Sequence, residues 1–501
     1  MSGESCFVAH GSRPRLFVAL LAPALLAAQA PQPVPTVPLA PPPATPPAAP
    51  PIVAPPHVMP HLTDGQRAQL RDFLDTAAAN GIAASDTTSA APTSQSDTAL
   101  VDAAMDYAKA VHGGRLATGD FQTDWGLRPE AYDPWTGFVD AVQHDTLAAW
   151  FASLPPPYAG YDTLKKALAT YRGIDRAGGW PVIAAGPDIG PGATGDRVAA
   201  MRERLAIEDA TLAKGGDKYD DDLAAAVQRA QKRYGLEPNG IVGKATLAAL
   251  NVPAHDRVRQ IEANMERWRW LPAQLPEHRV QVNIAAAVLT VFDADKPVTS
   301  MRAVTGRPGD ETPMLSSQIH SIVFNPPWNV PSSIATKELW PKERAHPGYL
   351  KAHGFRVIGS GPTARLQQNS KKSALGKVKF DFDNPYGVYL HDTPTQGTFD
   401  RYSRLASHGC VRLAHPVDLA KLALQGAPDW TPDAIDAALR KGDTVRARLP
   451  EPIAVFLLYW TAYASADGRV SFLGDPYGWD GALADRIQAS ANRAKQMVAA
   501  R

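Results

Sequence analysis

One cysteine, Cys410, lies in the stretch LASHGCVRLAHP, where histidines and an arginine surround it. A thiolate is a strong nucleophile, but a cysteine with an ordinary pKa near ~8.5 needs a base or a positive environment to react as one. His391, His408 and His415 are the bases close to it in the sequence. Gly409 allows a sharp turn that could aim backbone amides at a developing oxyanion. This pattern favours a nucleophilic cysteine.

Three other roles for the cysteine have less support. A zinc site could use His391, His408, Cys410 and His415, but no pair has the C-x2-C or H-x3-H spacing of such sites. The chain has 2 cysteines, and Cys6 lies in a segment expected to be removed, so an intramolecular disulfide is not expected. An inert core cysteine would rarely have glycine, arginine and histidines around it. We therefore expect no metal and no cofactor.

The length and charge of the chain limit what else it does. A chain of 501 residues is too long for one ordinary domain and predicts two or three. Its formal net charge is +1 and no basic run stands out, so nucleic acid is not an expected partner.

The N-terminus has the pattern of an export signal. Arg13 and Arg15 precede the apolar stretch Leu16–Ala28, which is too short to span a bilayer comfortably. Ala28-Gln29-Ala30 has the small-x-small pattern of a cleavage site, although Pro31 is a poor residue after it. Cleavage and export are the first prediction, and an uncleaved membrane anchor is the alternative.

The rest of the chain divides by its patterning into four kinds of segment. Residues 31–60 are rich in proline and alanine and predict an extended linker. Helical periodicity follows to residue 187, and residues 188–252 predict a small three-helix unit. After a linking helix, alternating stretches such as RVQVNI, VLTVF and KVKFDF predict strands without βαβ alternation. The fold class that we predict is multidomain α+β.

Two motifs carry a resemblance to known families. HDTP, followed after an interval by SHGCVRL, closely resembles the signature of the L,D-transpeptidases, the YkuD-type cysteine enzymes of bacterial cell walls. The stretch AVQRAQKRYGLEPNGIVGKATLAALN resembles the peptidoglycan-binding domain found beside many wall enzymes. NMERWRWLP, TGRPGDETPMLSSQI, FNPPWNVPSSIA and the tail VFLLYWTAYASADGRVSFLGDPYG resemble one large periplasmic subgroup.

This resemblance implies a domain order. It consists of a signal peptide (1–30), a disordered linker (31–60), a helical scaffold domain (61–187, joined by helix 253–272), a peptidoglycan-binding domain (188–252), a mainly β catalytic domain (275–450) with a cap at about 336–382, and a C-terminal tail (451–501). The implied location is the periplasm, with attachment to the inner membrane if the signal stays uncleaved.

The resemblance also implies roles for single residues. These are Cys410 as nucleophile, His391 as general base oriented by the backbone carbonyl next to it, His408 and Gly409 as oxyanion hole and support together with the Cys410 amide, Ser407 as shaper of the turn, Arg412 as a substrate-carboxylate or orienting group, and Tyr389 and Trp328 as groove residues. For Tyr389 and Trp328 a role as core aromatics is nearly as well supported.

The implied reaction is acyl transfer between peptidoglycan stem peptides. The cysteine attacks a tetrapeptide donor, D-alanine leaves, and an amine of a second stem resolves the thioester as a 3-3 crosslink. Water or a lipoprotein lysine as acceptor would instead give an L,D-carboxypeptidase or a lipoprotein-attaching enzyme, and these alternatives stay open.

The expected partners are tetrapeptide stems and glycan strands, with other wall-synthesis enzymes as further candidates, and carbapenems are expected inhibitors. A non-enzymatic wall-binding protein is a third interpretation, against which an intact Cys410, His391 and Gly409 speak.

Overall fold

The computed structural model describes residues 58–82, 96–361, 364–465 and 468–499. The predicted signal peptide (1–30) and most of the proline-rich segment (31–60) lie outside the described residues. Among the described helices, none is both long enough and apolar enough to cross a membrane.

The first part of the described chain is helical and has a core of its own. Its helix α1 begins at a capping box, in which the Thr63 hydroxyl accepts from the Gln66 amide and the Gln66 side chain accepts from the Thr63 amide. Leu70, Phe73 and Tyr107 are among the side chains buried between these helices. The elements are α1 (Asp64–Asp75), η1 (Ala78–Asn80), α2 (Asp97–Gly113), η3 (Thr118–Asp120), α3 (Trp135–Gln143), α4 (Leu147–Ser153) and α5 (Ala159–Arg176).

Three short helices follow: α6 (Asp196–Glu208), α7 (Asp221–Arg233) and α8 (Lys244–Leu250). Helix α7 begins where the Asp220 carboxylate accepts from the Leu223 amide, 2.9 Å away. Val198, Leu205, Leu223 and Val227 recur at helical spacing and are all buried. The three helices therefore form by the amphipathic pattern that the sequence shows.

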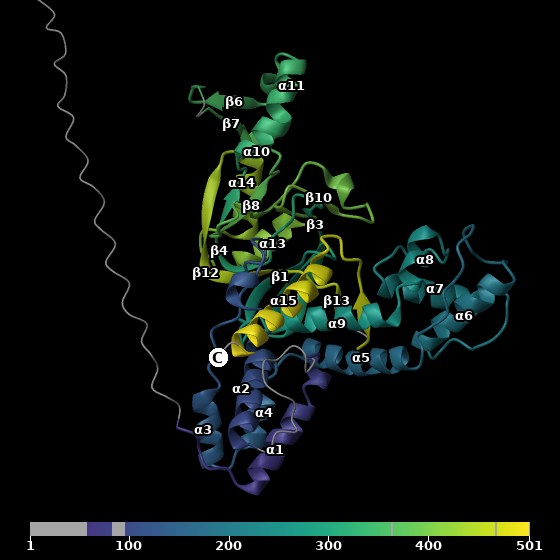
Figure 1. Cartoon of the computed structure of the whole chain (residues 1–501). Helices are drawn as coiled ribbons and strands as arrows, with labels where there is room; N and C mark the ends of the chain where they lie inside the picture. The colour runs from purple at the N-terminus through teal and green to yellow at the C-terminus, as the bar shows by residue number, and fades with distance from the viewer. Residues whose placement is uncertain (1–57, 83–95, 362–363, 466–467, 500–501) are drawn as a thin grey trace, which may run out of the picture. The chain divides into compact units, whose positions relative to one another are not determined.

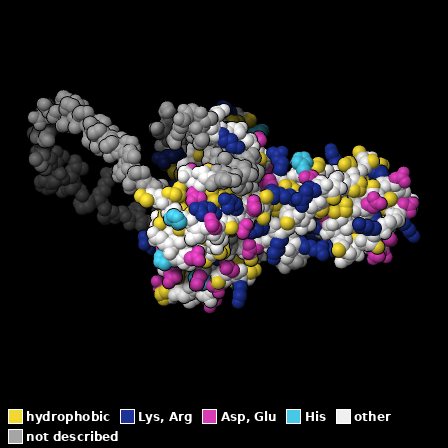
Figure 2. All heavy atoms as spheres, turned by 60° about the horizontal axis from the view of Figure 1, so that its bottom comes forward, with side chains coloured by type: hydrophobic (Ala, Val, Ile, Leu, Met, Phe, Trp, Pro, Cys, Tyr) yellow, Lys and Arg dark blue, Asp and Glu magenta, His cyan; other side chains and the backbone are white. Residues whose placement is uncertain are grey.

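Helix α9 (Ala254–Trp268) connects this helical part to the β-rich part of the chain. It lies beside α5 (Figure 1), and its last residue, Trp268, stacks on Trp460 with ring centroids 4.6 Å apart. One turn earlier in this helix, the Asn264 amide group donates to the Thr461 hydroxyl at 2.8 Å. On the face of the molecule shown in Figure 2, acidic and basic side chains are interspersed, in keeping with the small net charge.

A nine-stranded sheet forms the β-rich part, in the order β10-β3-β11-β9-β8-β4-β12-β1-β2. Strand β2 also pairs with β3, so the sheet closes on itself like a barrel. Its strands are β1 (His278–Asn283), β2 (Val288–Asp293), β3 (Lys296–Gly306), β4 (Leu315–Phe324), β8 (Val378–Phe382), β9 (Leu390–His391), β10 (Leu405–Ser407), β11 (Val411–Leu413) and β12 (Val445–Leu458). The other elements of this part are η7 (Gln396–Thr398), α13 (Pro416–Ala423), α14 (Pro432–Lys441), the hairpin β13 (Ala462–Ala464) and β14 (Val470–Phe472), and α15 (Trp479–Ala499).

A small subdomain is inserted between β4 and β8 and has its own apolar core. Val330, Leu339, Leu350 and Leu366 are buried in it. It contains a three-stranded sheet in the order β5-β7-β6. Its elements are β5 (Trp328–Asn329), α10 (Ser332–Ile334), the π-helical turn η4 (Ala335–Leu339), α11 (Trp340–Ala345), α12 (Tyr349–Ala352), β6 (Phe355–Ile358), β7 (Arg365–Gln368) and η6 (Ser370–Lys372).

The α+β class predicted from the sequence is confirmed, with helices first and a mainly β part after them. Two predicted boundaries differ from the elements. The inserted subdomain begins at β5, before residue 336, and β8 at the end of the predicted cap pairs with β4 in the large sheet. The predicted boundary at 450/451 cuts through β12, whose second half pairs with β1 in parallel. Both differences arise because strand pairing joins segments that are far apart in the sequence.

Candidate active site

Cys410 lies in a turn between two strands that both pair with β3. Strand β10 runs parallel to β3, and β11 runs antiparallel to it. Gly409, in the middle of this turn, has φ +103°, and a Cβ there would lie 3.2 Å from the carbonyl oxygen of Glu311. Only glycine takes this conformation without strain. The turn leaves Cys410 half-buried and in contact with a cavity.

Side-chain hydroxyls hold this turn in place. The Ser407 hydroxyl donates to the Cys410 carbonyl at 2.5 Å and accepts from the Gly409 amide at 3.2 Å. The Thr312 hydroxyl donates to the Gly409 carbonyl at 2.7 Å and accepts from the Gly306 amide at 2.8 Å. The sequence predicted three amides for an oxyanion hole, those of His408, Gly409 and Cys410. The Gly409 amide already donates to Ser407 and so does not point into the cavity.

The other two amides of the turn, those of His408 and Cys410, have no hydrogen-bond acceptor among the described residues. An amide without an internal acceptor, beside a cavity, is available to a ligand oxygen. These two N–H groups are therefore the ones that could meet an oxyanion.

Strand pairing brings His391 to the same place. It is the last residue of β9, which pairs in parallel with β11 so that His391 lies opposite Arg412. The His391 ring is only 4% exposed, and its Nδ1 contacts the carbonyl oxygen of Asp392. Because a carbonyl only accepts, Nδ1 carries the proton and Nε2 keeps a free lone pair. No hydrogen bond joins the ring to the Cys410 thiol in the described structure.

The protonation states of His391 and Cys410 follow from their surroundings. Burial, and then the positive charge of Arg412, lower the pKa of His391 to about 3. Burial raises the pKa of the Cys410 thiol, and hydrogen bonding from Tyr389 partly opposes this rise. At neutral pH the pair is consequently a neutral imidazole and a neutral thiol. A proton would have to pass from sulfur to nitrogen as the thiol attacks.

Tyr389 packs against both of these groups. Its ring meets that of His391 edge-on with centroids 5.5 Å apart, and the Lys379 ammonium lies 4.4 Å from its centroid. Burial, followed by the neighbouring Cys410 sulfur, raises the pKa of the Tyr389 hydroxyl, so this group stays protonated and can donate to sulfur.

A cavity of about 800 Å³ collects nearly all the predicted site residues. Its lining includes Trp328, Tyr389, His391, Ser407, His408, Cys410 and Arg412, whereas Gly409 is buried behind it. Burial lowers the pKa of the half-buried Arg412. No carboxylate among the described residues pairs with Arg412, so its charge is available to an anionic group in the cavity.

Two side chains at the site are not among the residues that the sequence predicted there. Glu338, in the inserted subdomain, pairs with His408 across 2.6 Å and lies 3.8 Å from Arg307. Tyr477, near the start of α15, donates to the Gly306 carbonyl at 2.5 Å and accepts from the Thr312 amide at 3.3 Å. Both connect the cysteine turn to distant parts of the chain, which no local pattern indicates.

Among the described residues, no group of three or more histidine, cysteine, aspartate or glutamate side chains could hold a metal ion. His415, the third histidine considered for zinc, precedes α13 as its N-cap residue.

Sequence models of three families match the chain. The model described as "L,D-transpeptidase catalytic domain" (YkuD) matches residues 277–435. The models described as "Scaffold domain" and "Putative peptidoglycan binding domain" match residues 58–168 and 194–250. The curated "Putative L,D-transpeptidase" of Haemophilus influenzae is 30% identical over 239 residues, which cover 44% of this chain and 48% of that protein. The match thus spans about half the length of this relative.

Solved L,D-transpeptidase structures are also similar, at low identity. The enzyme from Stackebrandtia nassauensis is 15% identical, with 56% of this chain and 96% of that chain covered and a TM-score of 0.22. Residues 123-326 of the enzyme from Xylanimonas cellulosilytica are 17% identical, with 55% and 99% covered and a TM-score of 0.17. These TM-scores are too low for the two structures to support any conclusion about this chain. Along the chain the matches follow the order scaffold domain, peptidoglycan-binding domain and L,D-transpeptidase catalytic domain, so the chain combines regions that are similar to each of these three families.

Proposed function

We propose that the protein is an L,D-transpeptidase that forms 3-3 crosslinks between peptidoglycan stem peptides through a thioester on Cys410. The observation that carries this proposal is one cavity that holds a thiol, a buried neutral imidazole with a free Nε2 and a guanidinium without a carboxylate partner among the described residues. These groups supply a nucleophile, its base and a binding site for a substrate carboxylate.

In the first step the Cys410 sulfur attacks the carbonyl carbon between the third residue of a donor tetrapeptide and its terminal D-alanine. His391 takes the thiol proton at Nε2 as the C–S bond forms. The carbonyl oxygen gains negative charge, which the amides of His408 and Cys410 stabilise. The C–N bond then breaks, and His391 returns the proton to the departing amine of D-alanine.

In the second step an amine of a neighbouring stem attacks the thioester. His391 removes a proton from this amine, the C–S bond breaks, and the sulfur is protonated again. Splitting one displacement into two in this way is the usual advantage of covalent catalysis. Water or a lipoprotein lysine would react with the same thioester by the same proton transfers, giving a carboxypeptidase or a lipoprotein-attaching enzyme.

The proposal places the protein in the periplasm, in contact with tetrapeptide stems and glycan strands. The matches to L,D-transpeptidase and peptidoglycan-binding domains support a location at the cell wall. The predicted export signal supports passage across the membrane. Residues 188–252 are proposed as the part that holds the enzyme on its substrate.

Intact-mass spectrometry of the full chain tests the proposal. Incubation with a carbapenem should add one drug mass to Cys410, and disaccharide-tetrapeptide alone should give a crosslinked dimer with loss of D-alanine. Cys410→Ala should lose both signals, whereas EDTA should leave both unchanged. An adduct that survives Cys410→Ala would reject the mechanism, and hydrolysed product without dimer would assign water as the acceptor.

A further inference from the structure

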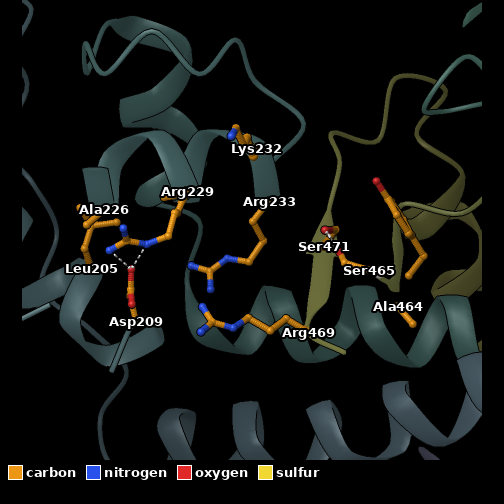
Figure 3. A pocket seen from close by; sticks show the side chains of 12 residues that line it. Leu205, Asp209, Ala226, Arg229, Lys232, Arg233, Ala464, Ser465, Arg469 and Ser471 are labelled. Carbon is orange, nitrogen blue, oxygen red and sulfur yellow. Dashed lines mark hydrogen bonds and ion pairs between the residues drawn. The ribbon is translucent and has the colours of Figure 1, made fainter. Parts of the chain in front are cut away.

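A second cavity, of about 530 Å³, lies between the three-helix unit and the hairpin β13–β14. Helices α6 and α7 supply one wall and the hairpin supplies the other (Figure 3). It shares no lining residue with the Cys410 cavity. Its lining consists of Leu205, Asp209, Ala226, Arg229, Ala230, Lys232, Arg233, Tyr463, Ala464, Ser465, Arg469 and Ser471.

The lining is strongly cationic. Among the described residues that line it, Arg229, Lys232, Arg233 and Arg469 contribute four positive charges, and Asp209 contributes the one carboxylate. Asp209 is already bound, because Arg229 donates to it at 2.8 Å. Arg233 extends from α7 and Arg469 extends from the hairpin toward the same space (Figure 3). Cations that converge on one cavity from two elements create a local positive potential that attracts an anion.

The described residues behind the wall do not fully cancel the charges of Lys232 and Arg233. Glu208 is buried there and pairs with both Arg204, at 2.5 Å, and Arg233, at 3.1 Å. One carboxylate thus serves two guanidinium groups. In addition, the buried Nε of Arg233 has no hydrogen-bond partner among the described residues. No described residue pairs with the exposed Lys232, so positive charge remains on the cavity side.

The remainder of the lining is uncharged and mostly small, with Leu205 and Tyr463 as its two larger side chains. Alanines from α7 and from β13 face the cavity together with Ser465 and Ser471, whose hydroxyls bond to each other. Such a surface suits a ligand that alternates carboxylates with methyl-sized side chains and backbone amides.

We infer that this cavity is a second peptidoglycan site, which binds the carboxylates of a stem peptide through Lys232, Arg233 and Arg469. The inference rests on the proposed function for the identity of the ligand. Two parts of the chain build the site together, since β14 packs against the three-helix unit through the Phe472 and Tyr234 rings, with centroids 6.4 Å apart. The peptide carboxylates, rather than the sugar chain, would therefore hold the enzyme on the wall.

Co-sedimentation of the full chain with purified sacculi at low ionic strength tests the inference. Lys232→Glu and Arg469→Glu should each weaken retention by about tenfold, the usual effect of losing one charge-assisted contact. Lys214→Glu is the matched control, because Lys214 is exposed in the same unit but does not line the cavity. It should change retention by less than about twofold. Melting curves identify any variant that is unfolded, and Lys232→Gln and Arg469→Gln then replace it.

Two competitors distinguish peptide from sugar. Free tetrapeptide should release the chain from sacculi, whereas glycan strands stripped of their peptides should not. Unchanged retention in both cavity variants, or release by the stripped glycan, would overturn the inference. Carbapenem acylation of Cys410 is measured in parallel and should be equal in all variants. A wild-type chain that resists acylation would count against the proposed function, yet its retention would still report on this cavity.

Discussion

Thr312 offers the sharpest test of how the fold holds the turn that contains Cys410. Its side chain is fully buried, and its hydroxyl joins the Gly306 amide at 2.8 Å to the Gly409 carbonyl at 2.7 Å. Thr312→Val keeps the shape of the side chain and removes both bonds. An amide and a carbonyl that are buried would then lack partners, each at a cost of about 1–3 kcal/mol. We expect the variant to lose roughly 2 kcal/mol or more of unfolding free energy.

Catalysis should suffer as well, because the freed Gly409 carbonyl adjoins the Cys410 amide. A displacement of the reacting group by about 1 Å can cost about 10²-fold in rate. We therefore expect Thr312→Val to acylate with a carbapenem about tenfold to a hundredfold more slowly. Thr312→Ser is the matched control, because it keeps the hydroxyl and should stay close to wild type in both respects.

The assay combines chemical denaturation with the second-order acylation rate from time-resolved intact mass. Slower acylation of a folded Thr312→Val chain, rescued in Thr312→Ser, would support a positioning role for Thr312. If Thr312→Val unfolds and acylates like wild type, the two hydrogen bonds do not position the cysteine turn, and a positioning role for Thr312 is refuted.

Three further predictions concern the groups around the cavity. His391→Ala should leave the chain folded and slow acylation by about 10²-fold or more, while His408→Ala should cost less, and the reverse order would assign the base to His408. Because the pKa of His391 falls to about 3 in the folded chain from about 6.5 when unfolded, the unfolded chain binds the extra proton first. The free energy of unfolding should thus decline as the pH drops from about 6.5 towards 3. In His391→Ala this free energy, measured by denaturation at each pH, should decline less steeply, and an equal decline in both chains would contradict the assignment. Glu338→Ala, which breaks the 2.6 Å pair with His408, should alter turnover of disaccharide-tetrapeptide more than acylation by a small carbapenem, and equal effects would limit Glu338 to supporting His408.

The site residues that could be predicted from the sequence are those that lie close together in the sequence. Cys410, Gly409 and Ser407 adjoin in one turn, so their types alone indicated a nucleophile on a tight bend. His391 could be nominated because it ends an alternating stretch. The registers that place it opposite Arg412 could not be predicted, since β9 and β11 pair within a sheet whose order is far from sequence order. The three amphipathic helices of residues 188–252 could likewise be predicted from periodicity.

What the sequence could not indicate are the contacts that join its parts. Glu338 lies in a π-helical turn of the inserted subdomain and meets His408, 70 residues away. Tyr477 reaches Gly306 over an even longer stretch, 171 residues. Neither residue belongs to a periodic pattern. The role of each depends on a contact with a residue far away in the sequence. The same holds for the cationic cavity, where Lys232 and Arg469 come together only once the hairpin packs on α7. The proposed nucleophile is thus encoded in a short motif, whereas its support and the proposed second binding surface depend on the packing of the whole chain.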